Sequence, residues 1–352
     1  MIMRNRVLGG TGMEVSTYCL GAMMFGAVGN PDHDDCVRII HTALDQGINF
    51  VDTADMYSDG ESEEIVGKAL RDRRDDVVLA TKVHFPMGDG PNRSGNSRRW
   101  IVKEVEESLR RLRTDWIDLY QIHRPDHRTD IEETLAALTD LVRAGKIRAF
   151  GCSTFPAEDI VEAYHVADRR GLQRFRTEQP PYSILARGIE ASVLPTCTRL
   201  GMGVLTWSPL AWGFLSGRYR KNQPVDLTTG RAALAPARFD PADPVVAAKL
   251  DAVEDLVALA ADIGCSLPEL AVAFVAAHPG VTSVILGPRT MEQLESLLNS
   301  ASLTLDDATL DRIDEIVPPG TNVYQPDGVW RPPALTNTSL RRRPLVDRAA
   351  AD

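Results

Sequence analysis

The chain has 352 residues, of which 43% are hydrophobic and 25% are charged, enough to bury a large core in one big domain or two modest ones. Its formal net charge of −10 opposes a polyphosphate-binding surface, so nucleic acid is not an expected partner. The five cysteines are scattered, and the chain shows neither a signal peptide nor an apolar run of about 20 residues, so we expect a cytoplasmic protein without a membrane segment.

Short apolar runs bounded by turn residues predict the strands. Residues 1–15 predict a β-hairpin that turns at Gly9, Gly10 and Gly12, because this cluster neither matches G-x-G-x-x-G nor precedes a helix. The strands expected along the chain cover 14–21, 48–52, 76–83, 116–123, 147–153, 174–179, 203–210 and 282–287.

Apolar residues three or four positions apart predict helices between these strands. Ile101, Val105, Leu109 and Leu112 form one such stripe, and Ser97 stands at the N-cap position before it. The expected helices cover 34–46, 61–72, 97–115, 130–146, 156–171, 189–200, 244–263, 267–277 and 290–299.

This alternation predicts an α/β protein with the fold of a (β/α)8 TIM barrel, because strands joined by helical crossovers are parallel and about eight units occur. An open doubly wound sheet is the alternative. We assign residues 1–317 to a single barrel that includes the hairpin, and residues 318–352 to a Pro-rich C-terminal tail. Tyr324 and Trp330 in that tail either fold back over the opening or belong to a loose tail or a subunit contact.

Polar residues occur where the expected strands end, and the active site of a closed barrel lies at the C-terminal ends of its strands. Asp52 ends one strand and Tyr57 follows it in the loop, while Lys82 and His123 end the next two strands. Each residue alone has an ordinary explanation, but together they form an acid–base set. A tyrosine has a reference pKa near ~10, and an ammonium about 4 Å away supplies on the order of 4 kcal/mol, enough to make it a usable acid.

Three segments resemble the aldo-keto reductase family. GINFVDTADMYSDGESEEIVGKAL (47–70) is similar to that family's aspartate and tyrosine signature, VVLATKV (77–83) to its lysine strand and IDLYQIHRPD (117–126) to its histidine strand. The resemblance implies a (β/α)8 barrel that binds a nicotinamide cofactor without a Rossmann fold and reduces aldehydes or ketones. It implies Tyr57 as general acid, Lys82 and Asp52 as the pair that lowers its pKa, and His123 as the residue that orients the carbonyl.

The resemblance also implies a set of cofactor contacts. Ser153 and Gln179 match positions that hold the nicotinamide carboxamide, Trp207 matches the aromatic residue that stacks on the ring, and Thr154 stands where asparagine is usual. SPLAWGFLSGRY (208–219) resembles the loop that closes over the pyrophosphate, and GPRTMEQLESLLNS (287–300) resembles the adenosine-phosphate motif. The implied contacts are Gly21, Met23, Ser153, Thr154, Gln179, Trp207, Ser208, Pro209, Leu210, Gly213, Leu215, Gly217, Arg218, Gly287, Arg289 and Gln293.

Arg289 is the expected partner of a 2′-phosphate, because a guanidinium suits phosphate geometry. We therefore expect NADP(H) in preference to NAD(H), although Ser296 and Leu297 replace a glutamate and an asparagine that are common near the adenine. The expected substrate is a small carbonyl compound in an apolar pocket. The residues expected to line that pocket, for each of which core packing is the ordinary alternative, are Met24, Phe25, Phe85 and Trp212.

Two other functions are also considered. A cofactor-binding regulatory or accessory subunit with little turnover is possible on the same scaffold, because channel β-subunits resemble this family. A metal-dependent lyase or hydrolase is disfavoured, since no His and carboxylate cluster at ligand spacing occurs at the strand ends. Pro125 also prevents the helix that would align His123 with His127, so no metal is expected. The oligomeric state is left open.

Overall fold

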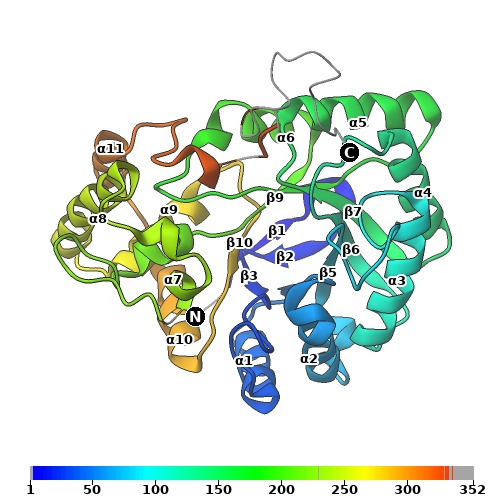
Figure 1. Cartoon of the computed structure of the whole chain (residues 1–352), viewed down its shortest axis with the longest axis horizontal. Coiled ribbons are helices and arrows are strands. Elements are labelled where there is room, and N and C mark those ends of the chain that lie inside the picture. Colours follow the sequence, from blue (N-terminus) through cyan, green and yellow to red (C-terminus); the bar gives the residue numbers. More distant parts are fainter. Residues whose placement is uncertain (1–2, 229, 329, 333–334, 336–352) are drawn as a thin grey trace.

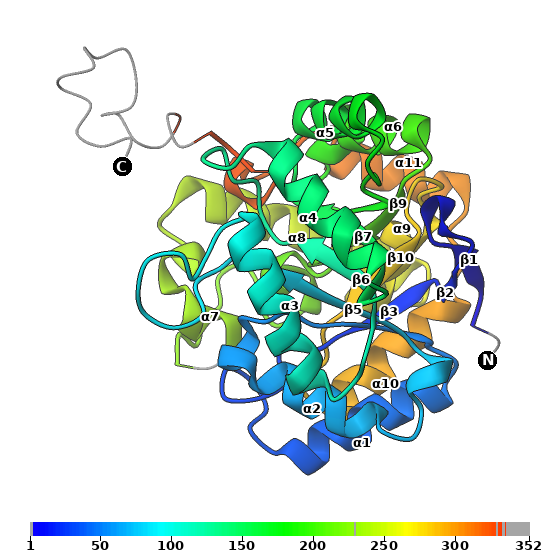
Figure 2. The ribbon, with the colours of Figure 1, turned by 90° about the vertical axis from the view of Figure 1, so that its right-hand side faces the viewer.

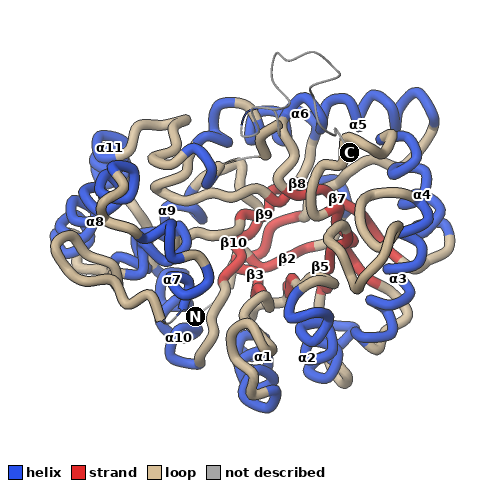
Figure 3. The backbone as a smooth tube through the Cα atoms, viewed as in Figure 1, coloured by secondary structure: helices blue, strands red, loops and turns tan. Residues whose placement is uncertain are grey.

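Eight parallel strands close into a barrel, and the helices surround it (Figure 1, Figure 3). The computed structural model describes residues 3–228, 230–328, 330–332 and 335. Around the ring the strands follow the order β10, β3, β4, β5, β6, β7, β8, β9. Their bounds are β3 (Tyr18–Gly21), β4 (Phe50–Asp52), β5 (Val78–Val83), β6 (Ile117–Ile122), β7 (Ile147–Ser153), β8 (Thr177–Gln179), β9 (Gly203–Thr206) and β10 (Ser283–Leu286). The predicted (β/α)8 fold is confirmed, and the open-sheet alternative is wrong.

The helices lie close to their predicted positions. Ser97 caps α3 as expected, since its Oγ accepts from the N–H of Trp100. The predicted helices are α1 (His33–Asp45), α2 (Glu61–Leu70), α3 (Arg98–Leu112), α4 (Ile131–Arg143), α5 (Ala157–Arg170), α6 (Val193–Leu200), α8 (Pro244–Asp262), α9 (Leu267–Ala277) and α10 (Met291–Asn299). The helices α7 (Gly230–Leu234) and α11 (Asp307–Ile316) were not predicted. Among the described helices none alone has the length and apolar character needed to cross a membrane; α8 and α9 meet both criteria only together, with a 90° bend between them.

The N-terminal hairpin closes one end of the barrel. Its strands β1 (Asn5–Val7) and β2 (Glu14–Ser16) are antiparallel and lie at the end opposite to α7 (Figure 2). Leu8 and Val15 are fully buried there in the inner core. The expected single strand 14–21 is therefore wrong: its first half pairs within the hairpin, whereas its second half, β3, joins the barrel.

Alternation along the barrel strands separates an inner core from an outer core, because successive side chains of a strand point to opposite faces. On β4, Phe50 belongs to the inner core and Val51 to the outer core, so the side chain of Asp52 points into the barrel. The same alternation places Lys82 inward, two residues after Ala80 of the inner core. The polar residues that follow the inner core therefore face one another at the C-terminal ends of the strands.

The described part of the expected C-terminal tail folds back onto the barrel. The N–H of Val323 donates to the Leu185 carbonyl at 3.0 Å, and the N–H of Trp330 donates to the Thr154 carbonyl at 3.4 Å. Between them, the buried carboxylate of Asp327 forms ion pairs with Arg238 and Lys249. The remainder of the tail, residues 329, 333–334 and 336–352, lies outside the described residues.

Candidate active site

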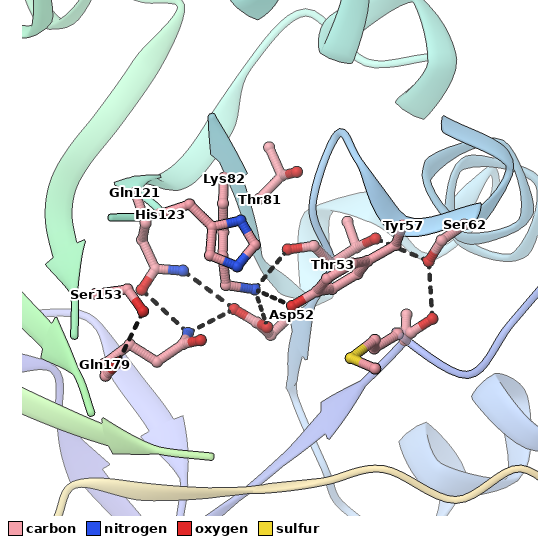
Figure 4. Close-up of polar contacts among 12 residues, drawn as sticks. Asp52, Thr53, Tyr57, Ser62, Thr81, Lys82, Gln121, His123, Ser153 and Gln179 are labelled. Carbon is pink, nitrogen blue, oxygen red and sulfur yellow. Dashed lines mark hydrogen bonds and ion pairs between the residues drawn. The ribbon is translucent and has the colours of Figure 1, made fainter. Parts of the chain in front are cut away.

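A buried lysine joins the carboxylate and the phenol at the centre of the barrel mouth. Lys82 Nζ lies 2.5 Å from Asp52 Oδ2 and 3.3 Å from the Tyr57 hydroxyl, and it also donates to the Thr53 carbonyl at 2.8 Å (Figure 4). The Lys82 side chain is fully buried. Burial alone would lower the pKa of Lys82, but attraction to Asp52 and to the Tyr57 oxygen outweighs it and raises that pKa. The ammonium is therefore held charged beside the phenol.

Two amide side chains complete the surroundings of the carboxylate. Gln121 Nε2 and Gln179 Nε2 donate to Asp52 Oδ1 at 3.0 and 2.8 Å, and Gln179 Nε2 is also 3.1 Å from Gln121 Oε1. Asp52 therefore has partners on both oxygens although it is buried, which offsets the cost of its desolvation. Gln121 was not predicted. Its inward position on β6, two residues before His123, is the signal that could have identified it.

The loop that carries Tyr57 is held in a strained conformation. Ser58, Asp59 and Gly60 follow Tyr57 and have φ values of 49°, 55° and 92°, a region that residues other than glycine rarely adopt. Hydrogen bonds fix the end of this loop: the hydroxyl of Ser62 donates to the Ala22 carbonyl at 2.8 Å and lies 2.9 Å from that of Thr53. Strain that the surroundings support is typical of functional sites, and this strained turn directly follows the tyrosine.

His123 follows β6 and faces the phenol. Its imidazole is buried, lies edge-on to the Tyr57 ring at 5.8 Å between centroids, and leaves Nδ1 without a partner among the described residues. Burial, with the nearby charges of Lys82 and Arg124, holds the pKa of His123 well below its usual range. The imidazole is therefore neutral and has one N–H to donate. Within the described ranges, no group of three or more His, Cys, Asp or Glu could hold a metal ion.

Ser153 and Thr154 stand at the end of β7, beside the predicted Gln179. Ser153 Oγ donates to the Gln179 carbonyl at 2.8 Å, so the two strand ends are joined. Thr154 has φ of 62°, which is unfavourable for a β-branched residue and easier for asparagine. Glu178 supports this turn, because its Oε1 accepts from the N–H of Phe155 at 3.0 Å. Burial raises the pKa of Glu178 to about 7, although that hydrogen bond opposes the shift.

The loop after β9 begins at Trp207, because β9 ends at Thr206 rather than at the predicted Leu210. Ala211, Trp212 and Gly213 have φ of 49°, 61° and 97°, so this loop too is strained. The N–H groups of Ala211, Trp212, Gly213 and Leu215 donate within the loop, to Ser208 and Leu210. These four backbone donors are thus already used within the loop, and the Arg218 guanidinium at its end pairs with Asp226 at 3.6 Å.

The predicted adenosine-phosphate motif forms the start of α10. Thr290 caps the helix, and Gln293 Oε1 accepts from the N–H of Arg289 at 2.8 Å. Asn30 Nδ2 donates to the Arg289 carbonyl at 3.0 Å. The Gln293 side chain therefore binds the backbone of Arg289. The Arg289 guanidinium is half-buried and makes no ion pair with any described residue.

The predicted pocket residues separate into two groups. Phe85 and Trp212 are half-buried, and Phe85 lies edge-on to His123 at 4.9 Å. Phe25 is fully buried in the outer core, and Met24 and Leu215 are also buried, which favours packing over contact with a ligand. Packing also explains why residue 21 is glycine. A Cβ there would lie 2.6 Å from Ile285 Cγ2.

The other predicted contacts surround this mouth from neighbouring loops. Met23 lies between β3 and α1, and Pro209, Gly217 and Gly287 follow β9 and β10. Two clefts, of about 240 and 360 Å³, lie elsewhere: both border Gln173, Arg174 and Arg176 at the N-terminal end of the barrel and contain none of the predicted site residues. These two clefts therefore do not alter the location of the candidate active site, which stays at the C-terminal ends of the barrel strands.

Two arginines near the mouth were not predicted. Arg124 follows His123 directly, and its guanidinium carbon lies 5.9 Å from the centroid of the Trp207 ring. Arg231, on α7, lies 3.9 Å from Met23 Sδ, and its guanidinium carbon lies 5.5 Å from the centroid of the Trp212 ring. Arg231 lies in a long loop without periodic pattern, so no local signal could have identified it. Both are half-buried, and neither makes an ion pair in the part of the chain that the structure describes.

Comparisons with known proteins agree with this geometry. Residues 18–318 match the model of the Aldo/keto reductase family. The chain is 39% identical to the uncharacterized oxidoreductase YrpG of Bacillus subtilis, covering 88% of this chain and 95% of that protein. It is 37% identical to a probable voltage-gated potassium channel subunit beta of Arabidopsis thaliana (90% and 97%). It is also 37% identical to the aldo-keto reductase YhdN of Bacillus subtilis (87% and 91%).

Proposed function

The chain belongs to the aldo/keto reductase family, and we propose that it is an NADP(H)-dependent reductase that converts an aldehyde or ketone to an alcohol, with Tyr57 as general acid. One observation carries the proposal. Lys82, fully buried, has its Nζ within hydrogen-bond distance of both the Asp52 carboxylate and the Tyr57 hydroxyl. A phenol can serve as an acid when a fixed cation stabilises the phenolate that it leaves behind.

The cofactor, when bound, supplies one hydride to the carbonyl carbon. As negative charge develops on the carbonyl oxygen, the Tyr57 hydroxyl donates its proton to that oxygen. Lys82 then stabilises the phenolate, and Asp52 keeps the ammonium charged and in place. The neutral imidazole of His123 donates its N–H to the same oxygen and so fixes the carbonyl in the orientation for reaction.

The residues around the mouth fit such a cofactor. Ser153 and the Oε1 atom of Gln179 stand beside the catalytic set, where a carboxamide could exchange hydrogen bonds, and the half-buried face of Trp207 suits stacking of a ring. Arg218 and Arg231 follow β9 and offer guanidinium groups for a pyrophosphate. Arg289, at the N-terminus of α10, offers one for a 2′-phosphate, which is why we propose NADP(H) rather than NAD(H).

The test replaces Tyr57 by phenylalanine. We expect the Tyr57→Phe variant to bind NADPH almost as wild type does, followed by quenching of tryptophan fluorescence, while reduction of 4-nitrobenzaldehyde falls by roughly 10²–10⁴-fold. Tyr164→Phe, on the outer helix α5, is the matched control and should keep its activity. Full activity of Tyr57→Phe would remove Tyr57 from the acid role.

A second function is favoured by one observation, the 37% identity to a plant protein described as a probable potassium channel subunit beta. On that basis the alternative is a cofactor-binding accessory subunit with little turnover. The two functions differ in one measurement. Tight NADPH binding with no reduction of any member of a panel of aldehydes, ketones and sugars would support the accessory subunit, whereas steady turnover would support the reductase.

A further inference from the structure

Arg124 places a cation at the rim of the carbonyl site. It follows His123 at the end of β6, and one Nη1 hydrogen bond, to the His123 carbonyl at 2.5 Å, holds the guanidinium. The guanidinium carbon lies 5.6 Å from the centroid of the Phe85 ring and 5.9 Å from that of Trp207. It therefore borders two of the aromatic side chains that surround the reacting position.

This cation has no counter-ion within the described residues. The Arg124 side chain makes no ion pair there and no hydrogen bond besides the one to the His123 carbonyl, so its Nε and Nη2 donors are unused; its backbone carbonyl accepts from Asn96 Nδ2 at 3.0 Å. Burial lowers the pKa of Arg124, and attraction to the Tyr57 oxygen and to Glu178 offsets only part of that effect. By contrast Arg128, an exposed arginine four residues further on, pairs with Asp126. Arg124 is half-buried, and charges that are partly withdrawn from water are commonly paired, so these unused donors suit a ligand anion.

The phosphates of the cofactor are an unsuitable partner for Arg124. The residues proposed for them, Arg218, Arg231 and Arg289, follow β9 and β10. In the closed ring β6 stands opposite to β10, with three strands between them on either side. Arg124 is therefore across the barrel from Arg289, on the side formed by Phe85 and His123. An anion at Arg124 must come from another molecule, and the substrate is the molecule that binds beside His123.

We infer that the substrate is a carbonyl compound that also carries a carboxylate, and that Arg124 binds this carboxylate at the rim of the pocket. The inference rests on the proposed function and adds the substrate class to it. Nε and Nη2 of a guanidinium present two parallel N–H groups that match the two oxygens of a carboxylate. Because Arg124 is adjacent to His123, binding at one end also positions the carbonyl for His123 and Tyr57.

The experiment compares 4-formylbenzoate with its methyl ester, which have nearly the same shape but differ by one negative charge. With NADPH in excess, we expect the wild-type protein to reduce the acid with the higher kcat/KM. Arg124→Met should lower kcat/KM for the acid by roughly 10- to 100-fold more than for the ester, since a hydrogen bond between charged groups is lost. Arg128→Met is the matched control and should leave the ratio of the two substrates at its wild-type value.

A second measurement, the inhibition constant of an unreactive carboxylate, reports on binding alone. Terephthalate carries the carboxylate but no reducible carbonyl, and its inhibition constant should rise about 10-fold in Arg124→Met and not in Arg128→Met. Equal losses on acid and ester, or an unchanged inhibition constant in a variant with a wild-type circular dichroism spectrum, would overturn the inference. A wild-type protein that prefers the ester would also overturn it while leaving the reductase function intact. If the wild-type protein reduced neither the acid nor the ester, that result would count against the reductase function.

Discussion

Replacing Glu178 by glutamine should change how the stability of the protein depends on pH. Glu178 is fully buried on β8, facing the outer layer beside Cys152, and its Oε2 has no partner among the described residues. Burial raises its pKa from 4.5 to about 7. Below pH ~4.5 the group is protonated in both folded and unfolded chains, and above pH ~7 it is ionised in both.

Between these values the unfolded chain has released the proton and the folded chain still holds it, so this group lowers the stability of the fold as pH rises. A difference of about 2.5 pKa units corresponds to a loss on the order of 3 kcal/mol across the interval. Glutamine keeps an acceptor for the N–H of Phe155 and has no charge. We therefore expect Glu178→Gln to gain stability relative to wild type by up to that amount as pH rises from 4.5 to 8.

The assay is urea unfolding followed by tryptophan fluorescence, repeated from pH 4.5 to 8.5. All other titrating groups are common to both proteins, so they cancel in the difference between their free energies of unfolding. Glu158→Gln, at an exposed position on α5, is the control and should follow the wild-type pH dependence. A difference between Glu178→Gln and wild type that stays constant over this range would refute the reasoning, because the carboxyl would then have the same charge in both states.

Three further outcomes follow from ion pairs and free charges. Lys82→Met should cut turnover by roughly 10²–10⁴-fold, and chemical unfolding should show a stability loss of about 3–5 kcal/mol, because Asp52 loses its buried partner. Arg289→Ala should raise the Kd for NADPH about 10-fold and leave that for NADH nearly unchanged; an equal rise would exclude contact with the 2′-phosphate. Asp327→Asn should lower the free energy of unfolding by about 3 kcal/mol, measured in urea, since Lys249 becomes an unpaired buried cation; an unchanged value would mean that the cation escapes to water.

The fold and the central site could be predicted because their signals are local. Alternation on a strand aims Asp52 and Lys82 inward, and the order of strands and helices brings their ends together. The break between β2 and β3 was not predicted, because nothing in residues 14–21 distinguishes the segment that pairs in the hairpin from the segment that joins the barrel. The helix α11, which follows the last strand, was not predicted either.

Two of the residues that sequence reasoning missed, Arg231 and Glu178, depend on contacts between distant parts of the chain. Arg231 reaches Met23 across 208 positions, from a loop whose sequence has no periodicity. Glu178 is polar in a position that faces the outer core, and only the packing around Phe155 shows why it is there. Phe25 shows the reverse case. Its place after β3 predicts contact with a ligand, while its side chain lies in the buried core, so that contact stays a prediction.

The pairing of β3 with β10 also has a consequence for synthesis of the protein. Tyr18, Cys19 and Leu20 form their ladder with Val284, Ile285 and Leu286, so the first and last strands of the ring meet only when nearly the whole chain has left the ribosome. Until then the nascent barrel keeps two open edges, one along β3 and one along β9, and such edges invite pairing with other chains. A chaperone that shields Tyr18–Gly21 until β10 has been synthesised should therefore raise the yield of folded protein.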